Sequence, residues 1–248
     1  MRDDLGAEVP LSTAPLRVVS LVPSITEAIA VSAPEVLVGA TDWCNYPPDL
    51  SVARVRGTKN PNLTAIAELR PDLVVANQEE NRKLDVDRLR ARGIAVWVTR
   101  IETVDEALGS LRRLFTGGLN VAPPAWLEEA EQVWAQPALG EGRRVAVPIW
   151  RKPWFWVGSG TYIDDVLSRI GLANVVTAPR YPKIGLADTL ALNPELVLLP
   201  DEPYAFSADD GPAAMAGIAT ALVPGRALSW YGPAMVSARR TLDEAIGG

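Results

Sequence analysis

Aromatic side chains gather in the loops that follow the apolar, strand-like runs of this chain. Trp43 and Tyr46 follow one such run, and Trp150 and Trp154 follow another. In parallel sheets, ligands bind beyond the carboxyl ends of the strands. Large rigid rings suit a pocket for a flat or bulky organic ligand, although a single loop aromatic can also cap the edge of its own core.

The predicted strand ends carry further candidates for ligand contact. The aromatic residues supply apolar contact, and the polar ones supply charge or hydrogen bonds. The candidates are Pro23, Ser24, Trp43, Lys59, Asn77, Trp150, Arg151, Trp154, Tyr181, Tyr204 and Trp230. Arg151 with Lys152 is either a solvated pair or a site facing an anionic ligand group.

Several kinds of catalytic and metal chemistry are excluded by composition. The chain has no histidine and a single cysteine, Cys44. It therefore has no Ser-His-Asp triad, no histidine-activated thiol and no histidine metal ligand. We predict no catalytic residues, no directly bound metal and no intrinsic cofactor, so the chain is not expected to be an enzyme. The less favoured enzyme alternative would need a carboxylate such as Glu79 or Glu202.

Charge and hydropathy limit which kinds of partner and which cellular location the sequence predicts. Lysine and arginine number 24 against 30 acidic residues, a net charge of −6, which argues against nucleic acid as a partner. No run of apolar residues is long enough to span a membrane. The start of the chain has neither a signal peptide nor a lipobox. This predicts a cytoplasmic protein, or a periplasmic or extracellular one if a signal was removed.

Strands alternate with helices along the chain, which predicts an α/β fold with mostly parallel sheets. Ser24 begins a Ser-x-x-Glu pattern that is typical of a boxed helix start. A helix–Pro–acid–strand joint at residues 69–75 recurs at residues 192–198. The recurrence favours two similar lobes.

The expected division has four parts. Residues 1–16 are a loose lead-in, residues 17–117 an N-terminal α/β lobe, residues 118–142 a linking helix, and residues 143–248 a C-terminal α/β lobe. The predicted strand at residues 144–150 opens the second lobe. Gly158-Ser159-Gly160-Thr161 is a turn with a helix cap, or alternatively an anion cradle.

Several motifs, taken in order, resemble one known family. They include Val18-Val19-Ser20-Leu21-Val22-Pro23-Ser24, Gly39-Ala40-Thr41-Asp42-Trp43, Leu69-Arg70-Pro71-Asp72, Gly158-Ser159-Gly160-Thr161-Tyr162, Leu192-Asn193-Pro194-Glu195 and Trp230-Tyr231-Gly232-Pro233. Over residues 17–245 the chain resembles the class III, helical-backbone solute-binding proteins of ABC transporters. Within that family it is most similar to the cobalamin-binding branch.

The resemblance implies two Rossmann-like lobes joined by a single long helix, with an aromatic ligand cleft between them. The implied ligand is cobalamin, haem or an iron–siderophore complex. By position, Trp43 replaces a tyrosine that lines the cleft in the family, Tyr181 replaces a cleft tryptophan, and Trp230 matches another aromatic residue of the second lobe. Lys59 stands where an aromatic residue is expected, so it would place a cation in the cleft.

The resemblance implies an ABC permease as a partner. The single linking helix and the acidic composition favour a monomer. Transport relatives carry one exposed glutamate on each lobe, which pairs with arginines of the permease. Thr64 and Ala187 stand at those positions, with Glu68 and Asp188 nearby. This departure leaves a second hypothesis open, a cytoplasmic sensor or carrier that has left transport.

Overall fold

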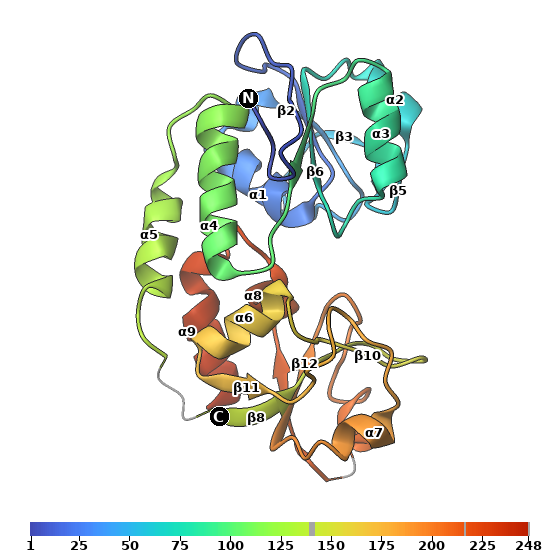
Figure 1. The fold of residues 1–248 in the computed structure, drawn as a ribbon, viewed down its shortest axis with the longest axis vertical. Coiled ribbons are helices and arrows are strands. Elements are labelled where there is room, and N and C mark those ends of the chain that lie inside the picture. The colour runs from blue at the N-terminus through green and yellow to red at the C-terminus, as the bar shows by residue number, and fades with distance from the viewer. Residues whose placement is uncertain (139–141, 216, 248) are drawn as a thin grey trace. The chain divides into compact units, whose positions relative to one another are not determined.

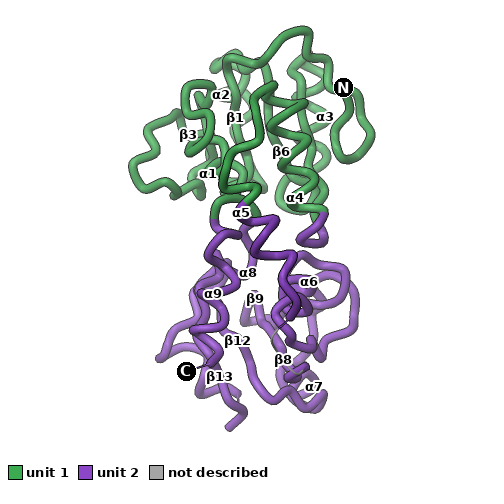
Figure 2. The backbone as a smooth tube through the Cα atoms, turned by 90° about the vertical axis from the view of Figure 1, so that its left-hand side faces the viewer, with its two compact units in different colours: residues 1–101, 106–128, 231–233 green, residues 102–105, 129–230, 234–248 purple. Residues whose placement is uncertain are grey.

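The computed structural model describes residues 1–138, 142–215 and 217–247. The chain folds into two compact units (Figure 2). Unit 1 comprises residues 1–101, 106–128 and 231–233, and unit 2 comprises residues 102–105, 129–230 and 234–248. Two short segments are thus assigned to a different unit from the residues on either side of them: residues 102–105 belong to unit 2, and residues 231–233 belong to unit 1. Within the described residues, no helix has the length and apolar character needed to cross a membrane.

Unit 1 is built on a parallel sheet. Its elements, in chain order, are β1 (Val18–Ser20), α1 (Pro23–Ser32), η1 (Pro34–Val36), β2 (Leu37–Ala40), β3 (Ala53–Arg54), β4 (Arg56–Gly57), β5 (Asn60–Pro61), α2 (Leu63–Glu68), β6 (Leu73–Asn77), α3 (Lys83–Ala91), β7 (Val96–Thr99), α4 (Val104–Arg113), the π-helical turn η2 (Leu114–Gly118) and the start of α5 (Ala125–Trp134).

Helices cover both faces of this sheet. Five strands pair in parallel in the order β3-β2-β1-β6-β7. Helices α1 and α4 lie on one side of the sheet, and α2 and α3 lie on the other (Figure 1). A sheet covered in this way needs strands that are apolar on both faces, and all five residues of β6 are buried. The strand order reverses between β1 and β6, so the carboxyl ends of these two strands mark the expected ligand-binding position.

Unit 2 has a second parallel sheet. Its elements are the rest of α5, β8 (Arg143–Ala146), β9 (Pro148–Trp150), β10 (Phe155–Trp156), α6 (Tyr162–Arg169), β11 (Leu172–Asn174), α7 (Leu186–Leu190), β12 (Leu196–Pro200), η3 (Pro212–Ala214), β13 (Ala219–Val223), α8 (Gly225–Ser229) and α9 (Met235–Ile246). Four strands pair in parallel in the order β11-β8-β12-β13, and the order reverses between β8 and β12. A separate antiparallel pair, β9 with β10, follows β8.

The recurring joint has matching contacts in the two units. In unit 1, the Asp72 carboxylate accepts the backbone N–H groups of Leu16 and Arg17 at 2.8 and 2.9 Å. The Arg17 side chain returns a hydrogen bond to the Leu69 carbonyl at the end of α2. Arg70, between them, has a positive φ of 46°. The acid thus holds the start of β1 beside β6, and the arginine caps the preceding helix.

Unit 2 has a similar arrangement. The Glu195 carboxylate accepts the N–H of Arg144 at 2.8 Å, and Arg144 donates to the carbonyl groups of Leu192 and Asn193. Asn193 takes the positive φ, here 53°. The repeated sequence motif therefore corresponds to a repeated set of contacts, which sets the register of β8 beside β12 and that of β1 beside β6.

Three boundary predictions differ from the structure. The predicted linking helix at residues 118–142 is much shorter, since α5 covers Ala125–Trp134, and residues 139–141 lie outside the described part. Pro148 begins a new strand, so the predicted strand 144–150 divides into β8 and β9. The expected loose lead-in is tied to unit 1. Asp3 is buried and pairs with Arg90 at 2.7 Å.

Candidate functional site

The carboxyl edge of the unit 1 sheet holds two of the predicted residues at the start of α1. Pro23 occupies the first turn, where its missing N–H costs nothing. The capping-box prediction for Ser24 is wrong, because Val22 is the N-cap and no side chain caps the helix. Ser24 is 4% exposed, and its hydroxyl has no hydrogen-bond partner within the described residues. Such a buried hydroxyl is available to a ligand or a water molecule.

Asn77 ends β6 beside this point, but its side chain is already used by the fold. Its Oδ1 accepts the N–H groups of Glu79 and Glu80 at 2.8 and 3.2 Å, and its Nδ2 donates to Thr99. This is an Asx-type turn that closes the loop after the strand. Asn77 therefore shapes the carboxyl edge of unit 1.

Trp43 is the most exposed ring at this edge. Its side chain is 64% exposed, and the nearby Tyr46 is 40% exposed. The indole lies against Gly57, where an added Cβ would come within 3.2 Å of Nε1. Glycine at that position leaves room for the ring to lie along the backbone. A large exposed indole over a strand end is typical of a binding surface.

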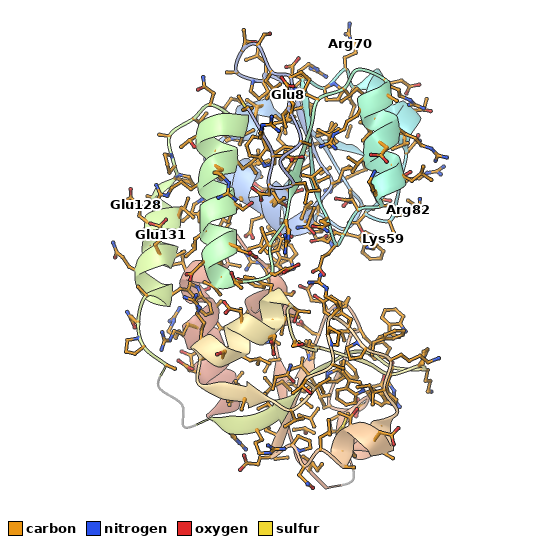
Figure 3. All side chains as sticks on the ribbon, viewed as in Figure 1. Glu8, Lys59, Arg70, Arg82, Glu128 and Glu131 are labelled. Atoms are coloured by element: carbon orange, nitrogen blue, oxygen red, sulfur yellow. The ribbon has the colours of Figure 1, made fainter. Side chains whose placement is uncertain are left out.

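Lys59 lies at the same end of unit 1. Figure 3 shows it at the opposite end of the unit from Arg70, which precedes β6. Its Nζ donates to the backbone carbonyl of Glu79. The lysine thus brings a positive charge to the edge that carries Trp43 and Ser24.

The carboxyl edge of the unit 2 sheet bears the other aromatic group. Trp150 ends β9, is 44% exposed and meets Tyr204 edge to face, with ring centroids 5.5 Å apart. Trp154 lies in the β9–β10 turn and stacks on Trp156 at 5.6 Å and on Phe206 at 6.2 Å. Trp154 and Tyr204 both pack on the unit 2 core. These two rings therefore cap their own domain core, whereas Trp150 extends into solvent.

Arg151 belongs to an ionic network that the sequence did not reveal. Its guanidinium pairs with Asp210 and lies over the Trp154 ring, 5.3 Å from the centroid. The Tyr204 hydroxyl donates to the other carboxylate oxygen of Asp210 at 2.5 Å. Asp210 is far from Arg151 in the chain and lies in no recognisable motif, so only the folded structure identifies it.

The remaining aromatic candidates are less exposed. Trp230 is 8% exposed and lies under the Arg226 guanidinium, 5.4 Å from its centroid. Tyr181 is half-buried, and the residues on either side of it accept backbone hydrogen bonds from the end of β10 and the loop after it, Pro182 from Trp156 and Arg180 from Gly158. Both residues lie in unit 2, as the sequence predicts.

Glu202 follows β12 and contacts Trp230. Burial raises the pKa of this carboxyl above its ordinary value, and the charge of Asp201 acts in the same direction. Hydrogen bonds from Trp230 and Ser229 and the charge of Arg226 oppose the shift only in part. Its Oε1 has no hydrogen-bond partner within the described residues. Glu202 is therefore half-buried, and its Oε1 has unused hydrogen-bonding capacity at the edge of unit 2, as the Ser24 hydroxyl has at the edge of unit 1.

The glycine-bearing loop before α6 is a structural turn. Thr161 is the N-cap of α6 and accepts the N–H of Asp164 at 3.3 Å. A Cβ on Gly158 would lie 1.9 Å from the Ala178 carbonyl oxygen, so only glycine fits this close approach. The turn-and-cap alternative is confirmed. Among the residues that the structure describes, no group of three or more acidic, histidine or cysteine side chains is placed to hold a metal ion.

No family model matches the chain. Curated relatives do match. The chain is 30% identical over 192 residues to the vitamin B12-binding protein of Salmonella typhimurium, covering 74% of this chain and 71% of that protein. It is 26% identical over 200 residues to the vitamin B12-binding protein of Pectobacterium carotovorum, covering 76% and 72%.

Solved structures share the fold. The periplasmic vitamin B12-binding protein of Vibrio cholerae superposes with a TM-score of 0.76 at 20% identity, covering 94% of this chain and 97% of that one. A periplasmic haem-binding protein of Pseudomonas aeruginosa gives 0.77 at 20% identity, covering 94% of each chain. Because both kinds of receptor match equally well, the fold alone does not select a ligand. The sequence relationship is more specific, and by it the chain belongs to the family of the vitamin B12-binding proteins.

Proposed function

We propose that the chain is a solute-binding protein that captures a corrinoid, or a similar organic complex of a metal, for uptake by an ABC transporter. The observation that carries the proposal is a pair of exposed indoles, Trp43 in unit 1 and Trp150 in unit 2, in a member of this family. Trp43 follows β2 of the parallel sheet in unit 1, and Trp150 ends β9, which continues from the carboxyl end of β8 and pairs with β10. A ligand that covers these rings removes their apolar surface from water, and this removal favours binding.

Polar groups at the same edges complement the rings. Lys59 in unit 1 supplies a cation, and the buried Ser24 hydroxyl and Glu202 Oε1 supply hydrogen-bonding capacity. A corrin ring has a broad apolar face and a rim of primary amides, which both donate and accept hydrogen bonds. Capture needs no covalent step, so no general acid, base or nucleophile is assigned.

Transport is part of the same proposal. The relatives of known fold from Vibrio cholerae and Pseudomonas aeruginosa are periplasmic, which supports a periplasmic location for this chain. Thr64 and Glu68 are both exposed on α2, and Ala187 and Asp188 are both exposed on α7. Glu68, one helical turn after Thr64, and Asp188, directly after Ala187, thus offer carboxylates near the docking positions for the arginines of a permease.

Calorimetric titration with cyanocobalamin tests the proposal. Haem and an iron–hydroxamate complex serve as parallel titrants. We expect one-to-one binding of cyanocobalamin with a micromolar or lower Kd. Absence of heat and of any fluorescence change with all three titrants would refute capture of a chelated metal. Tight binding of the iron–hydroxamate complex alone would replace the corrinoid with a siderophore.

A further inference from the structure

Arg151 is the cation next to the exposed Trp150, and its charge is already neutralised within unit 2. Its side chain is 18% exposed, and its Nη1 pairs with Oδ1 of Asp210. The face of the guanidinium lies over Trp154. Its Nε is buried without a hydrogen-bond partner among the described residues. The guanidinium is therefore held by a carboxylate on one side and by an aromatic face on the other.

Asp210 holds two of the predicted ligand contacts at once. Its Oδ1 pairs with Arg151, and its Oδ2 accepts the Tyr204 hydroxyl at 2.5 Å. Tyr204 in turn contacts Trp150 edge to face. The carboxylate is 40% exposed, so this network lies at the surface of the aromatic edge.

Ligands of similar shape differ in how they would meet this network. Haem carries two carboxylates on its rim, whereas a corrin ring carries primary amides. An unpaired arginine recognises a carboxylate strongly, through parallel charged hydrogen bonds. Here Asp210 takes that role, and its own negative charge repels a second carboxylate. Amides meet no such repulsion.

We propose that Asp210 is a specificity-determining residue, which neutralises Arg151 and so favours amide-bearing corrinoids over the carboxylate-bearing haem. The inference rests on the proposed function, because it requires the aromatic edge of unit 2 to contact the ligand. Asp210 then acts by excluding the competing ligand class, which is a common route to specificity.

The experiment compares haem with dicyanocobinamide, a corrinoid that has the amides but lacks the phosphate of cobalamin. Both are titrated into wild-type protein and into the variants Asp210→Asn and Asp210→Ser. Release of the Arg151 charge is expected to tighten haem binding about fivefold or more. This factor corresponds to the attraction between two opposite unit charges ~4 Å apart in bulk water. Cobinamide binding is expected to stay equal or weaken.

Two further variants test the route of the effect. Replacing Arg151 by glutamine in the Asp210→Asn background is expected to abolish the gain for haem. Asp209→Asn removes the same charge from the exposed neighbouring residue. It is the matched control, and the ratio of the two affinities is expected to stay at the wild-type value.

A purely structural role for Asp210 predicts that both affinities fall together, and that result would overturn the inference. A haem gain that persists without Arg151, or that appears equally in Asp209→Asn, would also overturn it. Failure of the proposed function looks different, because wild-type protein would then bind neither probe, and both proposals would fall. Thermal unfolding of each variant confirms that it is folded.

Discussion

Removal of the exposed indoles should weaken ligand binding by an amount that the structure sets. A tryptophan side chain offers about 200 Å² of surface. Trp150 is 44% exposed, so a ligand could cover at most about 90 Å² of it, worth about 2 kcal/mol at ~25 cal/mol per Å². Trp43 is 64% exposed, which gives about 3 kcal/mol on the same scale.

These are upper limits, because association also orders the side chains it covers. If the ligand covers half of the available surface, Trp150→Ala raises the Kd about sixfold, and full coverage raises it about fortyfold. Trp43→Ala should have the larger effect. The assay is calorimetric titration with cyanocobalamin at fixed salt, with thermal unfolding measured in parallel.

Leu192→Ala is the matched control. Leu192 is 39% exposed, so it also presents apolar surface, but it precedes β12 and therefore lies at the edge opposite to the proposed site. The Kd of this variant should stay within about twofold of wild type, since most surface substitutions cost under ~0.5 kcal/mol. Equal losses for Leu192→Ala and Trp150→Ala would refute the assignment of the indoles. An unchanged Kd in both Trp43→Ala and Trp150→Ala would refute it too.

Three further predictions concern stability. Gly158→Ala should destabilise unit 2 by about 2–3 kcal/mol, because the new Cβ would lie 1.9 Å from a backbone oxygen. Gly109→Ala inside α4 should instead stabilise the protein by up to ~1 kcal/mol. Urea unfolding compares the two variants, and equal effects would contradict the packing argument. Asp72→Asn should cost about 0.5–1 kcal/mol, because the hydrogen bonds to this carboxylate are exposed to solvent. The cost should exceed that of Glu195→Gln, because Asp72 accepts two backbone N–H groups and Glu195 one; the reverse order in chemical unfolding would contradict this. Burial raises the pKa of Glu202, so the folded wild type loses stability as the pH rises from the unfolded pKa of this carboxyl through its folded pKa. The stability of Glu202→Gln minus that of wild type should therefore be larger at pH 7 than at pH 4. A difference that does not change with pH would show that the carboxyl titrates normally.

Local patterns in the sequence predict most of the sheet strands and their joints. Buried strands such as Leu73–Asn77 consist mainly of apolar residues, and in each unit the acid of the Pro–acid joint accepts a backbone N–H from the start of the neighbouring strand. Three strands of the two parallel sheets are not predicted: β3 and β11 are only two and three residues long, and β13 is a short Ala-Thr-Ala-Leu-Val segment in which only Val223 is buried. The capping box at Ser24 failed because Pro23 already occupies the first turn and shifts the N-cap to Val22.

The candidate site was predictable only in part, for a physical reason. Strand-end position identifies loop aromatics, but whether a ring faces solvent or caps the core depends on tertiary packing. Trp150 is exposed, while Trp154 and Tyr204 pack on the core and Trp230 is buried. Asp210 pairs with Arg151, which is distant in sequence, and accepts a hydrogen bond from Tyr204 through a loop that forms no recognisable motif, so no local pattern indicates its role. Asn77 looks like a ligand contact by position, yet its amide closes a turn.

Hydrogen–deuterium exchange with and without saturating cyanocobalamin tests the central claim most directly. Backbone amides in the loops after β2, β6, β9 and β12 should exchange more slowly with ligand bound, because these loops carry Trp43, the Asn77 turn, Trp150 and Glu202. Amides at the opposite edges, around Arg70 and Asn193, should be unchanged. Protection confined to those opposite edges, or no protection anywhere at saturating ligand, would contradict capture at the carboxyl edges of the two sheets.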